Sequence, residues 1–469
     1  ASFLNYKGGS VTFTGNSTAG DAVFDNRGGS VTVWSNATAG NARIVNSAGG
    51  STNIWDDATA GRATIVNEAT GSLDIRDQAT AAQATVVNKT GAVVNIRGLT
   101  TAGTSIGSLE GGGRVLLGNK TLTTGGLNTS TEISGVISGV GGSLVKEGTG
   151  TLTLSGANTY TGGTALLKGR LNLGNAQALG TGELAMDDGT EIGFIAPGMT
   201  IANAIRFTGN SDPIIDTGAF DAGLSGAISG AGFITKIGTG TLTLSGANSY
   251  TGATDVAQGT LRAGAANTFS AASAHNVAAG ATLDLAGYSQ TVASLTNSGT
   301  VSLVGSVPGT TLTVNGAYVG NGGVLKLGTT LYFNGPPSDR LILNGPTASA
   351  SGKTTVQITN IGGLGALTNG NGIEVITAQN GAKTTAQPTK DAFSLADGHV
   401  DAGAFEYRLY AADALGQGEN WYLRSAQKGV TYYRPETSLY AALPNQLRQG
   451  SLAMLGDLRK RVGDDDVKG

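Results

Sequence analysis

A repeat of about twenty residues near the N-terminus is the feature that most constrains the fold of this chain. Consecutive copies begin at Asn26, Asn46, Asn67 and Asn88, a spacing of 20 or 21 residues, and an imperfect copy begins near Asn5. One such unit is too short to enclose a hydrophobic core, but stacked units bury one together. The spacing therefore predicts a solenoid in which each copy forms one coil.

Within each copy, apolar residues recur two positions apart, which is the period of one face of a β-strand. The equivalent positions form four columns: Val11, Val31, Thr52, Leu73 and Val94; Phe13, Val33, Ile54, Ile75 and Ile96; Ala22, Ala42, Ala63 and Ala84; and Phe24, Ile44, Ile65 and Val86. A helical period of 3.6 does not fit these windows. The recurring asparagines suit a corner, where Asn tolerates a left-handed conformation and its amide can hydrogen-bond to the next coil.

The length of the repeat narrows the choice of solenoid. A leucine-rich repeat would show regularly spaced leucines followed by Asn, a pattern that is missing here. A right-handed parallel β-helix needs coils of roughly this length, stacked ~4.8 Å apart. We therefore predict an all-β chain dominated by a right-handed parallel β-helix, with about 20 coils and a rod length on the order of 100 Å.

The middle of the chain contains a second, longer repeat. The string GTGTLTLSGAN occurs from Gly148 to Asn158 and returns unchanged from Gly238 to Asn248. Each copy follows a related phrase, SGVISGVGGSLVK from Ser134 and SGAISGAGFITK from Ser225. This region is therefore a degenerate duplication of a block of several coils.

These phrases resemble a known family. GTGTLTLSGANTYTGGT resembles the passenger-associated repeat of classical autotransporters, the type V secreted proteins of Gram-negative bacteria. FEYRLYAADALGQGENWYLRS, from Phe405 to Ser425, looks like the final strands of the pertactin-like autochaperone segment. YRPETSLYAALPNQL, from Tyr433 to Leu447, looks like the connection to a translocating barrel. The resemblance implies a surface-displayed passenger exported through a C-terminal outer-membrane barrel.

The resemblance also implies a C-terminal cap. Trp421, Tyr422 and Leu423 fall in the segment that caps the β-helix and starts its folding in this family. An open solenoid end exposes unpaired backbone and apolar core, so a β-rich cap meets a physical need. Apolar residues at helical spacing from Pro444 to Val462 predict a short linker helix with Pro444 in its first turn.

Four regions are expected on these grounds. They are β-helix coils over 1–110, β-helix with the duplicated repeats over 111–355, a cap resembling the autochaperone over 356–428, and a linker over 429–469 toward a translocator barrel that the sequence lacks.

Composition and candidate catalytic residues limit the possible chemistry. A net charge of −3 argues against a nucleic-acid partner, and the absence of cysteine excludes thiolate chemistry. The two histidines, His275 and His399, are expected to lie on the surface, because no nucleophile elbow supports a Ser-His-Asp triad. The sequence thus predicts no catalytic residue, cofactor or metal site.

Pairs of acidic residues make a glycan-active β-helix enzyme the third-ranked functional alternative. Asp56 and Asp57 are adjacent, Asp77 falls one coil beyond Asp56, and Asp187 and Asp188 form another pair. Adjacent residues on a strand face opposite sides, so such pairs do not converge on a substrate as catalytic acids must. Solvated acids at turns are the favoured interpretation.

One outward-facing column is the best candidate binding site. Trp34, Trp55, Arg76 and Arg97 occupy equivalent positions, each beside an inward-facing residue. Exposed aromatic rings can stack on sugar rings or insert into a partner, and arginine can pair with acidic groups. The alternative is an ordinary cross-coil ladder that contributes ~0.2–1 kcal/mol per pair.

These expectations combine into a functional hypothesis. We expect a non-enzymatic adhesin and virulence factor on the surface of a Gram-negative bacterium, binding a host-cell surface protein or glycan, or a neighbouring cell. Self-association between cells, which would cause autoaggregation and biofilm formation, is the second hypothesis.

Overall fold

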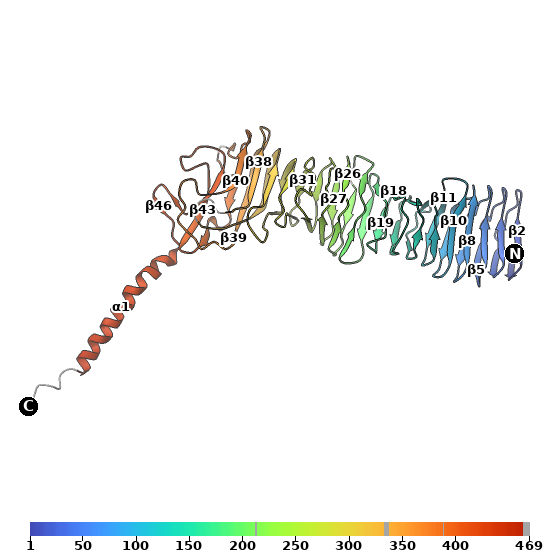
Figure 1. Cartoon of the computed structure of the whole chain (residues 1–469), viewed down its shortest axis with the longest axis horizontal. Coiled ribbons are helices and arrows are strands. Elements are labelled where there is room, and N and C mark those ends of the chain that lie inside the picture. Colours follow the sequence, from blue (N-terminus) through green and yellow to red (C-terminus); the bar gives the residue numbers. More distant parts are fainter. Residues whose placement is uncertain (212, 333–336, 388, 463–469) are drawn as a thin grey trace, which may run out of the picture.

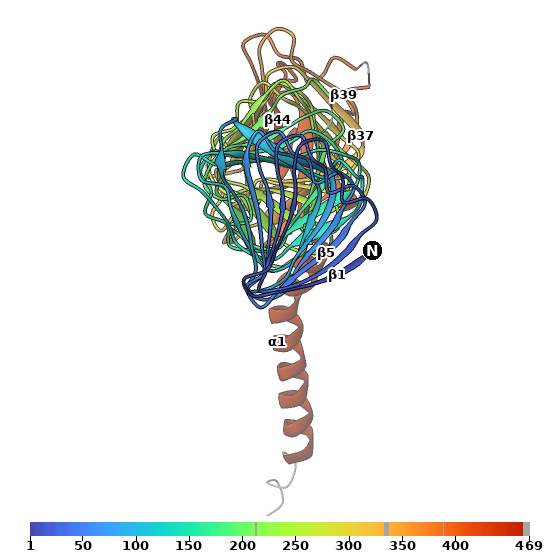
Figure 2. The same ribbon diagram turned by 90° about the vertical axis from the view of Figure 1, so that its right-hand side faces the viewer.

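The computed structural model describes residues 1–211, 213–332, 337–387 and 389–462, with side chains as far as Asp457. The chain forms a parallel β-solenoid of about 15 turns, which confirms the predicted fold. Figure 1 shows the coils stacked along one long axis, from the N-terminus at one end to the cap at the other. Figure 2, which looks onto the N-terminal end, shows the coils lying one behind another.

Two rows of parallel strands form the N-terminal coils. The first row contains β1 (Ser2–Tyr6), β3 (Val23–Arg27), β5 (Arg43–Ser47), β7 (Thr64–Asn67), β9 (Ala81–Asn88), β11 (Gly103–Glu110), β13 (Thr121–Thr124), β16 (Ser143–Lys146), β18 (Thr164–Leu166), β20 (Leu184–Met186), β23 (Ile205–Phe207) and β26 (Ile228–Gly230). The second row contains β2 (Ser10–Phe13), β4 (Ser30–Val33), β6 (Ser51–Ile54), β8 (Ser72–Asp77), β10 (Val93–Leu99), β12 (Arg114–Leu116) and β15 (Ile137–Ser138).

A third sheet runs through the middle and C-terminal coils. Its strands are β14 (Thr131–Ile133), β17 (Thr151–Leu154), β19 (Arg170–Leu173), β21 (Glu191–Phe194), β22 (Met199–Ile201), β24 (Ile214–Asp216), β25 (Ala222–Leu224), β27 (Ile234–Ile237), β28 (Thr241–Leu244), β29 (Thr254–Val256), β30 (Thr260–Ala263), β31 (Ala274–Val277), β32 (Thr282–Asp284), β34 (Ser294–Asn297), β35 (Thr300–Ser302), β37 (Ala317–Thr329), β39 (Ser349–Asn360) and β41 (Phe393–Leu395). From β17, the row passes through β19, β21 and β24 to β27 rather than to β28. The two copies of GTGTLTLSGAN therefore lie on different rows of the solenoid.

The fourth sheet changes from parallel to antiparallel pairing and forms the cap. Its strands are β33 (Gln290–Val292), β36 (Thr311–Val314), β38 (Arg340–Asn344), β40 (Ile373–Gln379), β42 (Val400–Ala402), β43 (Phe405–Ala411) and β44 (Trp421–Arg424). β33, β36, β38 and β40 pair in parallel, whereas β44 pairs antiparallel with both β40 and β43. A 3-10 turn, η1 (Ala396–Gly398), and a small hairpin of β45 (Ala426–Gln427) and β46 (Val430–Thr431) complete the cap.

The register of the N-terminal coils confirms the predicted columns. Val31 pairs with Thr52 and Val33 with Ile54, and the same alignment repeats in the neighbouring coils. Val33 and Ile54 are fully buried. Because burial along these strands alternates with exposure, the core lies inside the coil and every second side chain faces outward.

A ladder of buried asparagines links these coils, as predicted, but its members lie in the strands of the first row and do not adopt the left-handed conformation expected of a corner. The amide Nδ2 of Asn5 donates to Oδ1 of Asn26 at 2.9 Å, and Asn26 donates to Asn46 at 2.9 Å. The ladder continues from Asn46 to Asn67 at 2.8 Å and from Asn67 to Asn88 at 3.3 Å. Each amide thereby fixes the register of the next coil.

The solenoid has about 15 turns rather than the predicted 20. Later coils are longer than the N-terminal ones, since Leu312 pairs with Leu341 and Leu341 with Ile376. The last part of the chain also leaves the solenoid for the cap and the helix. At ~4.8 Å per coil, the solenoid is roughly 70 Å long.

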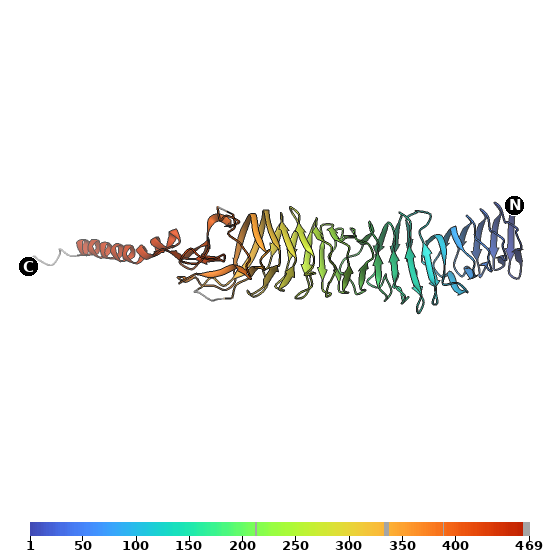
Figure 3. The same cartoon turned by 90° about the horizontal axis from the view of Figure 1, so that it is seen from above.

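The only α-helix among the described residues, α1 (Pro435–Val462), begins earlier than predicted. Pro435 takes the first helical position, where a missing N–H is tolerated. Pro444, predicted for the first turn, lies inside the helix instead. Figures 1 and 3 show α1 extending away from the cap, and its side chains as far as Asp457 are largely exposed. None of the described helices has the length and apolar character needed to cross a membrane.

Candidate binding surface

The predicted column lies where the strands of the second row end. Trp34 and Trp55 directly follow β4 and β6, and Arg76 lies near the end of β8. The residue after each of these three has a positive φ, between 54° and 62°. The chain therefore turns sharply just beyond the column, and the three side chains project from one edge of the sheet.

The three aligned side chains form a mixed aromatic and cationic surface. Trp34 is 47% exposed, whereas Trp55 is half-buried. The guanidinium carbon of Arg76 lies 5.3 Å from the ring centroid of Trp55, within the range of a cation–π contact. Arg76 also pairs with Asp74, so its charge is partly balanced.

The two tryptophans differ in how far they are open to a partner. The indole Nε1 of Trp55 is buried and has no hydrogen-bond partner among the described residues. The ring of Trp34 presents nearly half of its surface to solvent. The exposed ring of Trp34 can stack on a sugar ring.

Arg97 does not continue the column in register. A β-bulge between Asn95 and Gly98 places Gly98, not Arg97, opposite Arg76. A Cβ atom at Gly98 would lie 2.7 Å from Cγ of Arg76, so glycine makes room for the arginine side chain. Arg97 instead folds back, and its Nε donates to Oδ1 of Asn95 at 2.9 Å.

The proposed folding-cap residues lie in β44, between β40 and β43. Trp421, Tyr422 and Leu423 are 2%, 8% and 0% exposed. The indole Nε1 of Trp421 donates to Oγ1 of Thr384 at 3.0 Å, and its ring packs edge-on against Phe393 at 5.3 Å. These contacts tie three segments of the cap together and cover the C-terminal end of the core.

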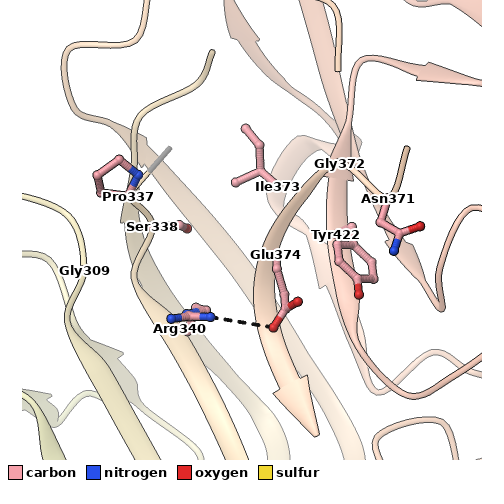
Figure 4. A pocket seen from close by; sticks show the side chains of 9 residues that line it. All are labelled: Gly309, Pro337, Ser338, Arg340, Asn371, Gly372, Ile373, Glu374 and Tyr422. Atoms are coloured by element: carbon pink, nitrogen blue, oxygen red, sulfur yellow. Dashed lines mark ion pairs between the residues drawn. The ribbon is translucent and has the colours of Figure 1, made fainter. Parts of the chain in front are cut away.

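A groove of about 560 Å³ lies in the cap between β38 and β40 (Figure 4). It is lined by Gly309, Pro337, Ser338, Arg340, Asn371, Gly372, Ile373, Glu374 and Tyr422. Nη1 of Arg340 lies 3.8 Å from Oε1 of Glu374 across this groove, as the dashed line in Figure 4 marks. Oε1 of Glu374 also accepts a hydrogen bond from Thr377 at 2.5 Å, so the charged groups here are engaged with each other and with the protein.

The duplicated repeats contain two buried lysines that were not predicted from the sequence. Lys146 and Lys236 are 1% and 0% exposed. Nζ of Lys146 donates to the carbonyl oxygens of Glu147, Gly148 and Lys168 at 2.8, 2.7 and 3.2 Å. Nζ of Lys236 makes the equivalent bonds in the second copy.

Burial is the main influence on the pKa values of these two lysines. It lowers the pKa of Lys146 and of Lys236 to about 8. Each lysine stands two residues after an inward-facing apolar residue, as in SLVK and FITK. Because side chains two apart on a strand face the same side, this alternation could have predicted that both lysines point inward. Their arrangement closes the glycine-rich corner of each repeat and is structural.

The two histidines differ in position, and the surface prediction was wrong for His275. His275 is fully buried, with Nδ1 3.1 Å from the carbonyl oxygen of Ser273 and Nε2 without a partner among the described residues. Burial lowers its pKa to about 4. His399 is partly exposed in the cap, where ligand atoms of His399, Asp401 and Glu406 lie within 4.8 Å of one another.

The neighbours of this cap cluster are cationic. Nε of Arg408 lies 2.6 Å from Oε1 of Glu406, and Nε of Arg434 lies 3.4 Å from Oδ2 of Asp401. Two guanidinium groups beside the carboxylates oppose a bound cation by charge repulsion. The cluster is therefore an ion-pair network of the cap.

Acidification is expected to destabilise the coils around His275. The folded-state pKa of about 4 lies below the ordinary histidine pKa of 6.5, so the unfolded chain binds more protons between these values. The contribution of neutral His275 to the free energy of unfolding is thus complete above pH 6.5. It is lost as the pH falls toward 4, by about 3 kcal/mol in total. Urea midpoints at about pH 7.5 and 4.5 measure the loss. A His275→Leu variant should lose less between the two pH values, and an equal loss in both proteins would contradict the assignment.

The acidic residues considered for catalysis lie at bends. Oδ2 of Asp77 accepts a hydrogen bond from the backbone N–H of Asp56 at 3.3 Å, and both residues have positive φ. Asp188 is exposed, and its Oδ1 accepts from the N–H of Ser211 at 2.7 Å. These carboxylates satisfy backbone donors at turns.

Comparisons with known proteins agree with the motifs. Residues 144–173 and 234–263 match the passenger-associated-transport-repeat family, and residues 290–409 match autochaperone domain type 1. The chain is 33% identical over 357 residues to the adhesin BmaC autotransporter of Brucella suis, covering 73% of this chain and 10% of that protein. It is 34% identical over 146 residues to the autotransporter adhesin AIDA-I of Escherichia coli, covering 30% of this chain and 10% of that protein.

The chain thus spans about a tenth of the length of these curated relatives. Among solved structures, the Hap adhesin of Haemophilus influenzae aligns with a TM-score of 0.37 and 13% identity, covering 90% of this chain and 64% of that one. With two passenger-associated repeats and an autochaperone domain on a parallel β-solenoid, the chain belongs to the passenger domains of classical autotransporters, which are exported across the outer membrane to the cell surface.

Proposed function

We propose that this passenger is a non-enzymatic adhesin that binds host or neighbouring-cell surfaces through the side of its rod. The observation behind the proposal is the column of exposed Trp34, half-buried Trp55 and exposed Arg76 at the edge of a rigid sheet. Exposed aromatic and arginine side chains are the types that dominate binding energy at interfaces. The relatives named as adhesins support the same role.

The mechanism we propose is avidity. Each rod contributes a small contact area, and many copies on one cell act together, so that modest single-site affinity still holds two surfaces in contact. A rigid solenoid suits this role, because its coils keep the binding column at a fixed distance from the cap.

A non-enzymatic role fits the acidic and histidine residues. His275 is buried within the coils, and the carboxylates of Asp77 and Asp188 accept hydrogen bonds from backbone N–H groups. A glycan-active enzyme instead needs two carboxyl groups facing one substrate. Release of reducing sugars from polysaccharides by the purified chain would support the enzyme alternative.

We also propose that α1 leads into an outer-membrane barrel in the full-length protein. Leu439, Tyr440, Leu447 and Met454 are each more than 60% exposed on this helix. Apolar side chains at this density on an isolated helix favour burial in a surrounding structure.

Self-association between cells remains the alternative function. Its support is the regular row of outward-facing polar side chains, which a second rod of the same kind could meet. Sedimentation of the purified chain across a range of concentrations separates the two hypotheses. A monomer at high concentration favours adhesion to other surfaces, whereas concentration-dependent dimers favour self-association.

Replacing Trp34 and Trp55 with alanine is expected to weaken binding of the purified chain to its target surface by at least about tenfold, because interface tryptophans are frequent hot spots. The measurement is binding to cultured host cells and to a glycan array. Tyr288→Ala is the matched control, since Tyr288 is 43% exposed on distant coils. Unchanged binding by the double variant would dismiss this column as the binding site.

A further inference from the structure

A shallow polar groove crosses the outward face of several coils, far along the rod from the tryptophan column. It has a volume of about 460 Å³ and is lined by Thr241, Thr260, Arg262, Thr282, Asp284, Thr300, Ser302, Val304 and Lys326. Most of these residues come from β28, β30, β32, β35 and β37, which stack in parallel. The groove therefore runs along the rod axis.

One side of the groove is a row of threonine hydroxyls. Thr241 pairs with Thr260, Thr260 with Thr282, and Thr282 with Thr300. Neighbouring strands place such residues ~4.8 Å apart. The hydroxyls of Thr260, Thr282 and Thr300 have no hydrogen-bond partner among the described residues, so each can both donate to and accept from a ligand.

The other side of the groove is a row of charged and polar residues. Arg262, Asp284, Ser302 and Lys326 occupy paired positions on successive strands. Nε of Arg262 lies 2.9 Å from Oδ2 of Asp284, and Oδ1 of Asp284 accepts from the N–H of Ala286 at 2.9 Å. Both oxygens of Asp284 are therefore engaged.

Lys326 supplies the unbalanced charge of the groove. It is half-buried, and no acidic partner for it occurs among the ion pairs of the described chain. At the opposite end of the groove, the backbone N–H of Thr241 donates to Oδ1 of Asp221 at 2.8 Å. Asp221 is not part of the groove lining, and its pKa is lowered by this hydrogen bond and by the nearby charges of Arg262 and Lys236. Within the lining, Arg262 and Asp284 balance each other, so the charge of Lys326 favours an anionic group beside it.

We propose that this groove binds a linear acidic polysaccharide laid along the rod axis. Lys326 holds one acidic group, the threonine hydroxyls exchange hydrogen bonds with sugar hydroxyls, and the Nη atoms of Arg262 donate to ring substituents. The groove contains no aromatic platform, so recognition is polar. This inference rests on the proposed adhesive function and names a ligand class for it.

The test is binding of the whole chain to immobilised polygalacturonate, with neutral dextran and dextran sulfate as comparison probes. We expect polygalacturonate binding, little dextran binding, and about a tenfold loss in Lys326→Ala and in Lys326→Gln, because one charge-assisted hydrogen bond is removed. Thr282→Val, which keeps the side-chain shape, should weaken binding by roughly threefold. Preference for dextran sulfate over polygalacturonate would identify sulfate rather than carboxylate as the bound group and still support the groove.

Arg206→Ala is the matched control. Arg206 is as exposed as Arg262 and is likewise paired with an acid, Glu183, but it lies on another sheet. We expect this variant to bind like the unmodified chain. Equal losses in Arg206→Ala and Lys326→Ala would show non-specific charge attraction and overturn the proposal.

Failure of this inference can be told from failure of the adhesin proposal. If Lys326→Ala binds polygalacturonate like the unmodified chain, or if neither binds it, the groove proposal is overturned. Binding of the same proteins to cultured cells is measured in parallel. Retained cell binding without polysaccharide binding overturns the groove and leaves the adhesive function standing.

Discussion

Replacing Asn46 with leucine is expected to lower the free energy of unfolding of the N-terminal coils by about 3–5 kcal/mol. The Asn46 amide donates to Oδ1 of Asn67 and the carbonyl of Ser72, and its Oδ1 accepts from Asn26 and from the hydroxyl of Thr52. Leucine has nearly the same size but leaves these buried groups unpaired, at about 1–3 kcal/mol for each unsatisfied group.

Asn41→Leu is the matched control for this substitution. Asn41 lies in the same coil, is exposed, and makes one side-chain bond, to Oδ1 of Asp21 at 2.9 Å. Its replacement should change stability by less than about 0.5 kcal/mol. Denaturant unfolding followed by circular dichroism, together with hydrogen exchange of individual coils, makes the measurement. Equal effects of the two substitutions would contradict a structural role for the asparagine ladder.

Replacing Trp421 with alanine is expected to destabilise the cap by about 3–5 kcal/mol. The ring of Trp421 is 2% exposed, packs against Phe393, and donates a hydrogen bond to Thr384. Alanine leaves a large cavity where β40 and β43 meet β44 and removes the hydrogen bond to Thr384, whose hydroxyl keeps its bond to the carbonyl oxygen of Glu419. Because the cap covers the end of the core, its loss should also expose the last coils of the solenoid.

The extent of unfolding separates a capping role from a local packing role. In a solenoid, each coil contacts only its neighbours, so Asn46→Leu should affect the first coils and spare the cap. Trp421→Ala should slow refolding of the whole chain if the cap serves as the template for the coils. Trp421→Phe, which keeps most of the packing, is the control. Normal refolding of Trp421→Ala would contradict the proposed role of the cap in folding.

Sequence predicted the N-terminal coils well because there each coil repeats the same local pattern. The columns of Val31 and Val33 and the asparagine ladder follow directly from a spacing of 20 or 21 residues. The number of coils was overestimated, because strands such as β38 and β40 are separated by long connections that contain no repeat.

The remaining differences arise from tertiary contacts that the pattern does not contain. The bulge at Gly98, which removes Arg97 from the column, brings Gly98 close to the Arg76 side chain on the preceding coil, a contact between coils that the repeat pattern does not show. His275 is buried because its strand has the same inward period as its apolar neighbours, although histidine is usually placed at the surface. α1 begins at Pro435, where the cap ends. It does not begin at Pro444, the proline of the predicted apolar stripe.

Display of this passenger on a non-adherent bacterium tests the adhesin proposal most directly. Cells that carry the passenger, fused to a barrel able to export it, are compared with cells that carry the barrel alone. We predict that the first bind cultured host cells or neighbouring bacteria and that the purified chain competes with this binding. Equal attachment of both strains, with the passenger folded and exposed on the surface, would contradict an adhesive function.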